Sequence, residues 1–536
     1  MKFRKVLLLF FLLGFGAIVE TIHFTRTAIN EGNFDGLRDF QIDGDFPFQP
    51  ARWAGRLMRF RGPSYDFTTS ETTDASGISA IEISNVLGDV SVTRSADPKA
   101  PIKVTLRKEV FSRRREQAGP YAEKVKLALT RDGSTVRIST NRDSNSDMRM
   151  RTHIDVETPT PLNTRVTNRH GKITIEGATA VNASGEFDDI RIVDVTGECI
   201  AKNRHANLEV ISAANGCRVE VQHGDAHVEK LLGATTIDIE HGNITALDLG
   251  ALKASLKFGD LQARKIAGAL STMGEHCDLK IEDVKGEVTL NNQGDIDIQN
   301  ILGRVVIENR RGHVRLMKAA LGVLINNTSD DVAVADVGGA LEVKNEHGHI
   351  RVQRFLKGAS LQSDGEDVEA SDFAGPLKVV VKRGGVSIKP MRKDLSPMDV
   401  SVDIGDVGIS LPSAVNALID AAVERGDVAS DSDALKTTEQ GKRSLKGTLG
   451  AGGVLVKLRS RLGDIKVSGP EGFEVSEPDF PDAPEIERRF KIAPPAPPAG
   501  PVMPAPPAPQ APKPAKPTTA PPAPPLPVAS PQPSLP

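Results

Sequence analysis

Large aromatic side chains are scarce in this chain of 536 residues. Phe, Tyr and Trp make up 4% of it, with two Tyr and one Trp. Globular cores draw much of their buried area from such rings, so their scarcity excludes a core built on large side chains. Stacked layers of Val, Ile, Leu and Ala, as in repeat proteins, fit this composition better.

Cysteine and net charge are low as well. Three cysteines are too few and too irregularly spaced for a disulfide scaffold or a zinc site, so we expect stability to come from stacking. The 67 basic and 70 acidic side chains leave a formal charge of −3, which provides no overall field for nucleic acid. We therefore expect no cofactor and no nucleic-acid partner.

What the sequence does contain is a short phrase that recurs between residues 168 and 390. Each copy has an apolar-alternating strand, a polar turn, a second such strand and usually another Gly. Successive turn residues are 17 or 18 positions apart. They are Gly171, Asp188, Ala206, Gly224, Gly242, Gly259, His276, Gly294, Gly312, Asp330, Gly348, Glu366 and Gly384.

Each repeat supplies two short strands with one apolar face. Pairs such as Val219 and Val221 precede the turn, and pairs such as Ile350 and Val352 follow it. A helix would need apolar residues with a period of 3.6, whereas here the period is two. A β-sandwich has no reason to keep its turns equally spaced over many repeats. The repeat pattern over residues 161–390 therefore predicts an all-β fold. We expect a single-chain parallel β-solenoid (β-helix) of about thirteen coils, with a core roughly 60 Å long.

Two β regions flank the repeats. At 76–160, alternating apolar residues predict strands, and the charged stretch 112–125 predicts one short helix between them. At 391–470 the turn phrase returns at wider intervals, and we expect this region to close the exposed end of the stack. The Ala-rich stretch 413–424 has helical propensity but is predicted as a strand by analogy with its neighbours.

The two ends of the chain have targeting and linker character. Residues 1–25 contain three basic residues and then a 14-residue apolar run, so a signal peptide and a retained membrane anchor both stay open. Residues 26–75 lack a sustained period and are predicted as a linker. The Pro/Ala-rich tail 471–536, with 20 prolines between 494 and 536, is predicted to be disordered and extended.

Cys199 and Cys217 occupy the same place in consecutive repeats. Stacking in register would set their Cα atoms about 4.8 Å apart, which lies within disulfide reach. The simpler interpretation is two small apolar side chains in one inward ladder.

His205, His223 and His241 each precede the turn residue in three successive repeats. Their rings would stack about 5 Å apart, close enough to share a soft metal ion or to titrate together near neutral pH. The alternative is that these turn positions are simply polar and exposed, and that imidazoles tolerate stacking there.

Asparagine recurs three residues before the turn, which predicts a ladder of side-chain amides hydrogen-bonding up the stack. The residues are Asn168, Asn203, Asn309, Asn327 and Asn345, with Asn292 shifted by one.

Three segments resemble the bacterial adhesin-like β-strand-repeat family, which is related to the head-GIN adhesin-like domains. They are residues 81–92 (IEISNVLGDVSV), the Asn-x-x-Gly turns such as Asn309 to Gly312, and residues 462–465 (LGDI). The resemblance covers about residues 76–470. It implies an exported bacterial envelope protein with a β-solenoid, periplasmic or at the cell surface, and it brings no catalytic residues.

The resulting expectation is a non-catalytic envelope scaffold that presents a binding surface to an envelope protein or a cell-wall or surface glycan. A polysaccharide-active β-helix enzyme is one alternative, because Asp330 and Glu366 offer carboxylates, although acids are ordinary at turns. A filament assembled end to end is another, and the closing region after residue 390 argues against it.

Overall fold

The computed structural model describes residues 63–142, 149–390, 394–412 and 414–469. The chain divides into two units, Met1–Phe473 and Glu474–Pro536, and the described residues belong to the first. The segments predicted as signal or anchor (1–25) and as Pro-rich tail (471–536) lie outside the described residues.

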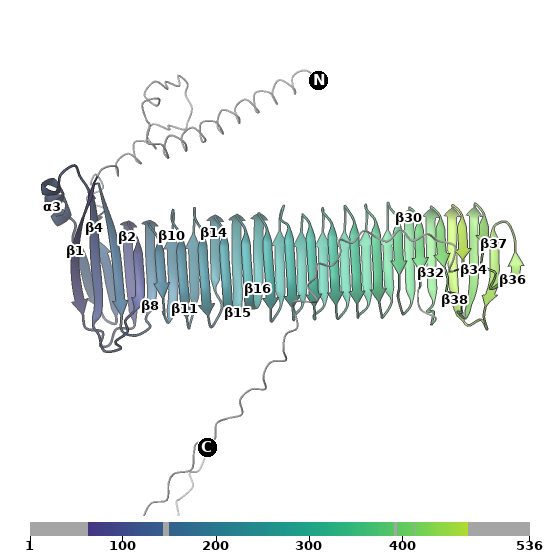
Figure 1. Ribbon diagram of the computed structural model, residues 1–536, viewed down its shortest axis with the longest axis horizontal. Coiled ribbons are helices and arrows are strands. Elements are labelled where there is room, and N and C mark those ends of the chain that lie inside the picture. The colour runs from purple at the N-terminus through teal and green to yellow at the C-terminus, as the bar shows by residue number, and fades with distance from the viewer. Residues whose placement is uncertain (1–62, 143–148, 391–393, 413, 470–536) are drawn as a thin grey trace, which may run out of the picture. The chain divides into compact units, whose positions relative to one another are not determined.

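The described strands lie side by side along one axis, each coil resting on the last (Figure 1). Every regular coil has one strand in each of two parallel sheets. Sheet 1 contains β8 (Asn163–His170), β10 (Ala180–Gly185), β12 (Cys199–Asn203), β14 (Arg218–His223), the second halves of β15 (Ala226–His241) and β16 (Ile244–Phe258), β18 (Leu270–Gly274), β20 (Val288–Asn292), β22 (Val305–Asn309), β24 (Val323–Asn327), β26 (Leu341–Asn345), β28 (Ala359–Ser363) and β30 (Leu377–Arg383).

Sheet 2 receives the chain after each polar turn. It contains β9 (Ile173–Glu176), β11 (Ile190–Val195), β13 (Leu208–Ala213), the first halves of β15 and β16, β17 (Leu261–Ile266), β19 (Leu279–Val284), β21 (Ile296–Ile301), β23 (Val314–Ala319), β25 (Val332–Val337), β27 (Ile350–Phe355), β29 (Val368–Ser371) and β31 (Val386–Lys389). These strands make thirteen regular coils, which confirms the predicted fold.

Register between coils follows the side-chain pattern. Val219 pairs with Ile237 in sheet 1, and Val334 pairs with Val352 in sheet 2. All four side chains are buried in the space between the sheets. A shift of one residue would turn each apolar set toward solvent, so the period of two fixes the register.

Sheet 2 strands have a bend that the sequence interpretation missed. In eleven consecutive coils one residue near the end of the strand has a positive φ although it is not Gly, and the pairing skips it. These residues are Asp194, Ser212, Lys230, Asp248, Lys265, Asp283, Asn300, Lys318, Asp336, Arg354 and Asp372. Asp and Asn tolerate this left-handed conformation better than most residues, and their frequency in this column was the available signal.

The N-terminal end is closed by strands that are out of chain order. One coil is formed by β2 (Ala80–Leu87) and β3 (Val90–Arg94). On one side it pairs with the first regular coil, and on the other side it pairs with a coil formed by β6 (Thr135–Thr140) and β7 (Met150–Thr158). At the outer side of the β6–β7 coil, β5 (Leu127–Asp132) pairs antiparallel with β6, and β4 (Ile102–Phe111) pairs antiparallel with β7. The predicted helix is α3 (Arg115–Lys124).

One boundary is corrected at this end. The linker predicted over 26–75 extends too far, because β1 (Ser64–Thr73) pairs antiparallel with β4 along its whole length. The outer residues of β1 are exposed, so its sequence has little of the apolar alternation that marks a buried strand. Pairing with β4 holds this segment, and its Tyr65 and Phe67 pack partly buried against a small apolar cluster.

The C-terminal end uses the same device. The last coil in the sequence consists of β38 (Val454–Leu462) and β39 (Ile465–Ser468). It lies between two earlier coils, one formed by β32 (Met398–Ile404) and β33 (Val407–Ser410), the other by β34 (Ala417–Arg425) and β35 (Val428–Ser430). The antiparallel strands β37 (Ser444–Leu449) and β36 (Leu435–Gln440) complete this end. The strand predicted within 413–424 is therefore confirmed as β34. All residues of β36 except Leu435 are exposed, and a polar edge of this kind discourages end-to-end pairing.

Candidate functional site

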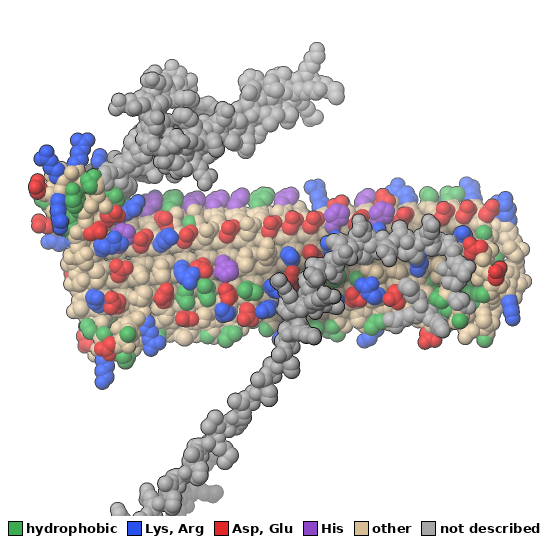
Figure 2. Space-filling view, in the orientation of Figure 1, with side chains coloured by type: hydrophobic (Ala, Val, Ile, Leu, Met, Phe, Trp, Pro, Cys, Tyr) green, Lys and Arg blue, Asp and Glu red, His purple; other side chains and the backbone are tan. Residues whose placement is uncertain are grey.

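A row of stacked rings runs along the edge where the chain passes from sheet 1 to sheet 2, which we call the turn edge. Figure 2 shows His and hydrophobic side chains in line along this edge. The rings, one per coil, are His170, Phe187, His205, His223, His241, Phe258 and His276. Successive centroids are between 4.5 and 5.7 Å apart, and their planes differ by at most 31°. We call this row the ring ladder.

The sequence interpretation found only the middle of this ladder. His205 and His223 stack at 5.3 Å with an interplanar angle of 1°, and His223 and His241 follow at 4.9 Å. Phe187 and Phe258 continue the same column. They were missed because imidazole and phenyl rings were considered as separate classes, whereas the ladder needs only planar rings at one turn position.

One predicted turn residue is corrected here. His276 was aligned with the turn glycines, but its ring lies in the ladder, and Cys277 occupies the glycine position, directly below Gly294. Cys277 is buried, and burial raises the pKa of its thiol to about 11. The positive φ required by the turn falls instead on His276.

The ladder presents ring edges to solvent, because the faces of its inner rings contact the neighbouring rings. Phe187 and Phe258 are 40% and 47% exposed, and His205, His223 and His241 are also exposed. Within the described residues, no group of three or more His, Cys, Asp or Glu side chains is arranged to hold a metal ion. The arrangement can therefore offer imidazole nitrogens and apolar ring edges in a line to a large partner.

The buried asparagines lie directly under the turn edge. Their Nδ2 groups donate to backbone carbonyls of the turns: Asn345 donates to Gly348 O in its own coil and to Asp330 O in the coil before, both at 2.9 Å. Among the described ladder residues, a direct amide contact joins only Asn327 to Asn345, at 3.2 Å. The predicted ladder does link coils, but its bonding partners were wrong, because the freed turn carbonyls need donors more than the amides need each other.

The residue after the turn glycine forms a second, outer ladder of Asp and Asn. Asp225 N donates to Asn207 Oδ1 and Asn243 N donates to Asp225 Oδ1, at 2.9 and 2.8 Å. Each side chain thus accepts the backbone N–H of the equivalent residue one coil further along. The Gly-Asp pairs of the sequence are explained by this bond.

The two acidic residues considered for catalysis both lie in turns of the stack. Asp330 Oδ2 accepts Gly312 N at 3.0 Å. Glu366 occupies a glycine position in the turn, and its carbonyl accepts the hydroxyl of Ser363 at 2.8 Å. Neither side chain lines either of the two open pockets described on the molecule.

Cys199 and Cys217 are stacked on neighbouring strands of sheet 1. Their Cα atoms are 4.6 Å apart, and the two sulfurs are paired. Both residues are buried, so the geometry also satisfies the inward apolar ladder. The disulfide stays a prediction.

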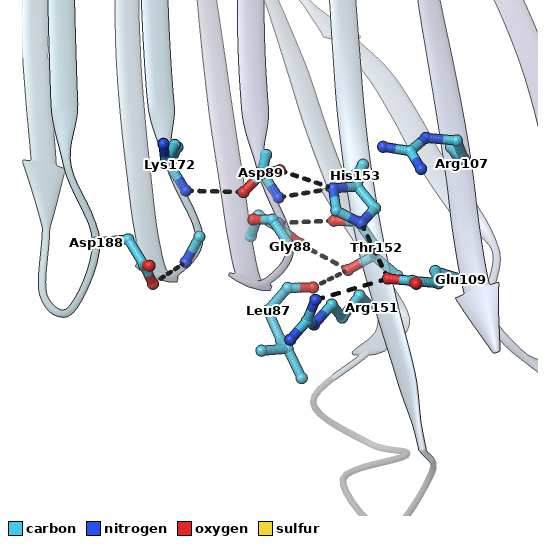
Figure 3. Close-up of polar contacts among 12 residues, drawn as sticks. Leu87, Gly88, Asp89, Arg107, Glu109, Arg151, Thr152, His153, Lys172 and Asp188 are labelled. Carbon is cyan, nitrogen blue, oxygen red and sulfur yellow. Dashed lines mark hydrogen bonds and ion pairs between the residues drawn. The ribbon is translucent and has the colours of Figure 1, made fainter. Parts of the chain in front are cut away.

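A compact polar cluster joins the inserted first coil to the N-terminal strands (Figure 3). The buried ring of His153 on β7 places Nδ1 3.2 Å from Asp89 Oδ2, and its Nε2 3.8 Å from Glu109 Oε2 on β4. Asp89 Oδ1 also accepts Lys172 N from the next coil at 2.9 Å. The cluster therefore holds three layers together, and its members are far apart in sequence.

The hydrogen bond from His153 and the amide of Lys172 lower the pKa of the Asp89 carboxyl, against the opposing effect of partial burial. A depressed folded-state pKa contributes stability above the unfolded value, near 3.9, that is lost as pH falls through the folded value. We expect Asp89→Asn to unfold about 1 kcal/mol more easily at pH 7, with the difference from the natural protein shrinking below about pH 4. Urea unfolding at several pH values checks this, and Asp155→Asn, at an exposed position of β7, should show no such trend. A difference that stayed constant from pH 7 to pH 3 would contradict the assignment.

Comparison with models of protein families finds a match that overlaps the repeat region. Residues 218–468 match the Toastrack DUF4097 family. This part of the chain is similar to Toastrack domains. The matched segment begins at β14 and ends at the last residue of β39, so it contains most of the regular coils together with the C-terminal closure. The resemblance to adhesin-like β-strand repeats is thereby confirmed.

Two solved structures are similar to this chain. One is a candidate cell adhesion protein from Clostridium sporogenes ATCC 15579, with 8% identity, a TM-score of 0.13, and coverage of 76% of this chain and 100% of that one. The other is a candidate adhesin from Bacteroides fragilis NCTC 9343, with 16% identity, a TM-score of 0.22, and coverage of 46% and 97%. At these TM-scores the two likenesses carry no argument about this chain. A comparison with curated proteins finds no match.

In the part of the chain that the structure describes, no helix has both the length and the apolar character needed to cross a bilayer. The signal or anchor predicted at 1–25 lies outside that part and stays a prediction.

Proposed function

We propose that this protein is a non-catalytic, exported scaffold of the bacterial envelope, which presents its turn edge as a binding surface to another macromolecule. The observation that carries the proposal is the ring ladder, seven rings in line over successive coils, of which all but the half-buried His170 are exposed. Exposed apolar groups in a contiguous row are a common mark of an interaction surface. Stacking of the coils does not require a ring at this position, because Ser329 and Gly365 occupy it in other coils.

The rigid stack of coils is suited to this role. Backbone pairing and a continuous core fix the spacing of the rings at about one per coil, so a long partner could engage several of them without any ordering of the protein. Low conformational cost on binding favours affinity from contacts that are individually weak. Export is supported by the basic and apolar order of residues 1–19 and by the sequence resemblance described above.

The test replaces three neighbouring rings. We expect a variant with His205→Ser, His223→Ser and His241→Ser to bind at least about tenfold more weakly to purified peptidoglycan or to an envelope extract, because each ring contributes on the order of 0.5–1.5 kcal/mol. Binding would be measured by sedimentation with the insoluble glycan and by solid-phase capture of the extract.

A matched control changes three exposed positions on sheet 2, Gln262, Lys280 and Arg315, to Ser. This control should bind as the natural protein does. If neither preparation bound the natural protein, or if the ring variant and the control bound equally, the turn edge would not be the binding surface.

A further inference from the structure

One turn of the turn edge is shorter than the others. We count the turn as the residues between the last inward-facing side chain of the sheet 1 strand and the first inward-facing side chain of the sheet 2 strand. In twelve of the thirteen regular coils this turn has four residues. The coil of β20 and β21 has three, Gln293, Gly294 and Asp295. This deletion explains the one-residue shift of Asn292 in the asparagine column.

The missing residue leaves a notch in the edge. A surface cavity of about 660 Å³ lies there, lined by His276 from the coil before, Gln293 from the short turn, Arg310 and Arg311 from the coil after, and Thr328 and Ser329 from the next. Because the parallel stack keeps the neighbouring turns at full length, the shortened turn forms the floor and its neighbours form the walls.

The wall on one side is the end of the ring ladder. His276 stacks on Phe258 at 5.7 Å with an interplanar angle of 5°, and the next coil contributes Gln293 to the notch instead of a ring. The notch therefore combines a terminal imidazole with amide and hydroxyl groups that can donate or accept hydrogen bonds.

The opposite wall is basic, because Arg310 and Arg311 line it. Within the described residues, neither Arg310 nor Arg311 forms an ion pair. The neighbouring acids are engaged elsewhere: Asp295 Oδ1 accepts His313 N at 2.8 Å, and Asp330 Oδ2 accepts Gly312 N at 3.0 Å. Two adjacent guanidinium groups beside neutral donors are suited to bind a carboxylate or a phosphate.

We propose that this notch binds an acidic saccharide, with its acid group on Arg310 and Arg311 and its sugar ring against His276 and Gln293. The inference rests on the proposed function, because it names the class of ligand for one place on the turn edge. A planar ring face and hydrogen-bonding side chains suit a sugar, whereas a free inorganic anion would need only the two arginines.

The experiment is isothermal titration calorimetry of the full chain at low ionic strength, since surface electrostatic binding weakens with salt. The probes are a galacturonic acid trisaccharide, the matching neutral galactose trisaccharide, and inorganic phosphate. We expect the acidic trisaccharide to bind most tightly. Binding should fall at least about tenfold in the double variant Arg310→Gln with Arg311→Gln, because two charge-assisted hydrogen-bonding groups are lost.

Two further variants make the test specific to the notch. Arg383→Gln removes a cation from the same turn position as Arg311 four coils further along and should leave binding unchanged. Inserting one His between Gln293 and Gly294 restores a four-residue turn and continues the ring column, so it should abolish binding although both arginines remain.

Three results would overturn the proposal: equal binding of the neutral trisaccharide, phosphate binding as tight as that of the acidic trisaccharide, or full binding by the insertion variant. Loss of envelope binding in the His205, His223 and His241 variant, with acidic trisaccharide binding intact, would separate the ring ladder from the notch. The two proposals can therefore fail independently.

Discussion

Replacing Gly242 with Ala is expected to destabilise the protein by roughly 3–5 kcal/mol, a large effect for one methyl group. Gly242 has a φ of 141°, and a Cβ atom there would lie 2.0 Å from the carbonyl oxygen of Gly224 in the coil before. Neither backbone can move away, because both belong to turns that are hydrogen-bonded on both sides: Gly224 N donates to His241 O, and Gly242 N donates to Phe258 O, both at 3.0 Å.

Thermal unfolding followed by circular dichroism would measure the loss, and amide exchange would locate it. In a stack of repeats each coil contacts only its neighbours, so protection should fall first in the coils on either side of residue 242. Gly119→Ala is the control, since a Cβ there meets no atom within 4 Å and the residue lies in α3. A Gly242→Ala protein with the natural midpoint would show that the coils can separate without cost.

The second large effect is expected for Phe355→Ala. Phe355 is the largest completely buried side chain among the described residues, and its ring stacks on that of Phe373 in the next coil, with centroids 4.8 Å apart and planes 2° apart. Loss of the ring would leave a cavity between sheets that cannot collapse, which costs roughly 3–5 kcal/mol. Denaturant unfolding would measure it.

The neighbouring residue provides the control. Leu356 is 48% exposed, so Leu356→Ala should change the free energy of unfolding by less than about 0.5 kcal/mol. A double-mutant cycle of Phe355 and Phe373 should give a coupling energy of about 0.5–1.5 kcal/mol between adjacent coils. Additive effects in that cycle would mean that the two rings stabilise their own coils separately.

Much of the regular architecture could be predicted from the sequence because its causes are local and repeated. Alternation of apolar residues such as Ile350 and Val352 sets which face is buried, and equal spacing forces each coil onto the last. Part of the candidate site followed in the same way, since residues at one turn position must stack. The full ring ladder was harder to foresee, because Phe187 and Phe258 share a shape with the histidines but no ionisable chemistry.

The amino-acid sequence was sufficient to predict the period, the two strands per coil, the parallel stack and a closing region at 391–470. The order of the coils at both ends became known from the folded structure, since a strand's own pattern does not say which neighbour it pairs with. For the same reason His153, Asp89 and Glu109 could not be brought together from spacing. The notch corresponds to one residue missing from the turn at 293–295, which is visible in the sequence. Its lining residues are known only from the structure, because the flanking coils place His276 and Arg311 on opposite sides of the gap.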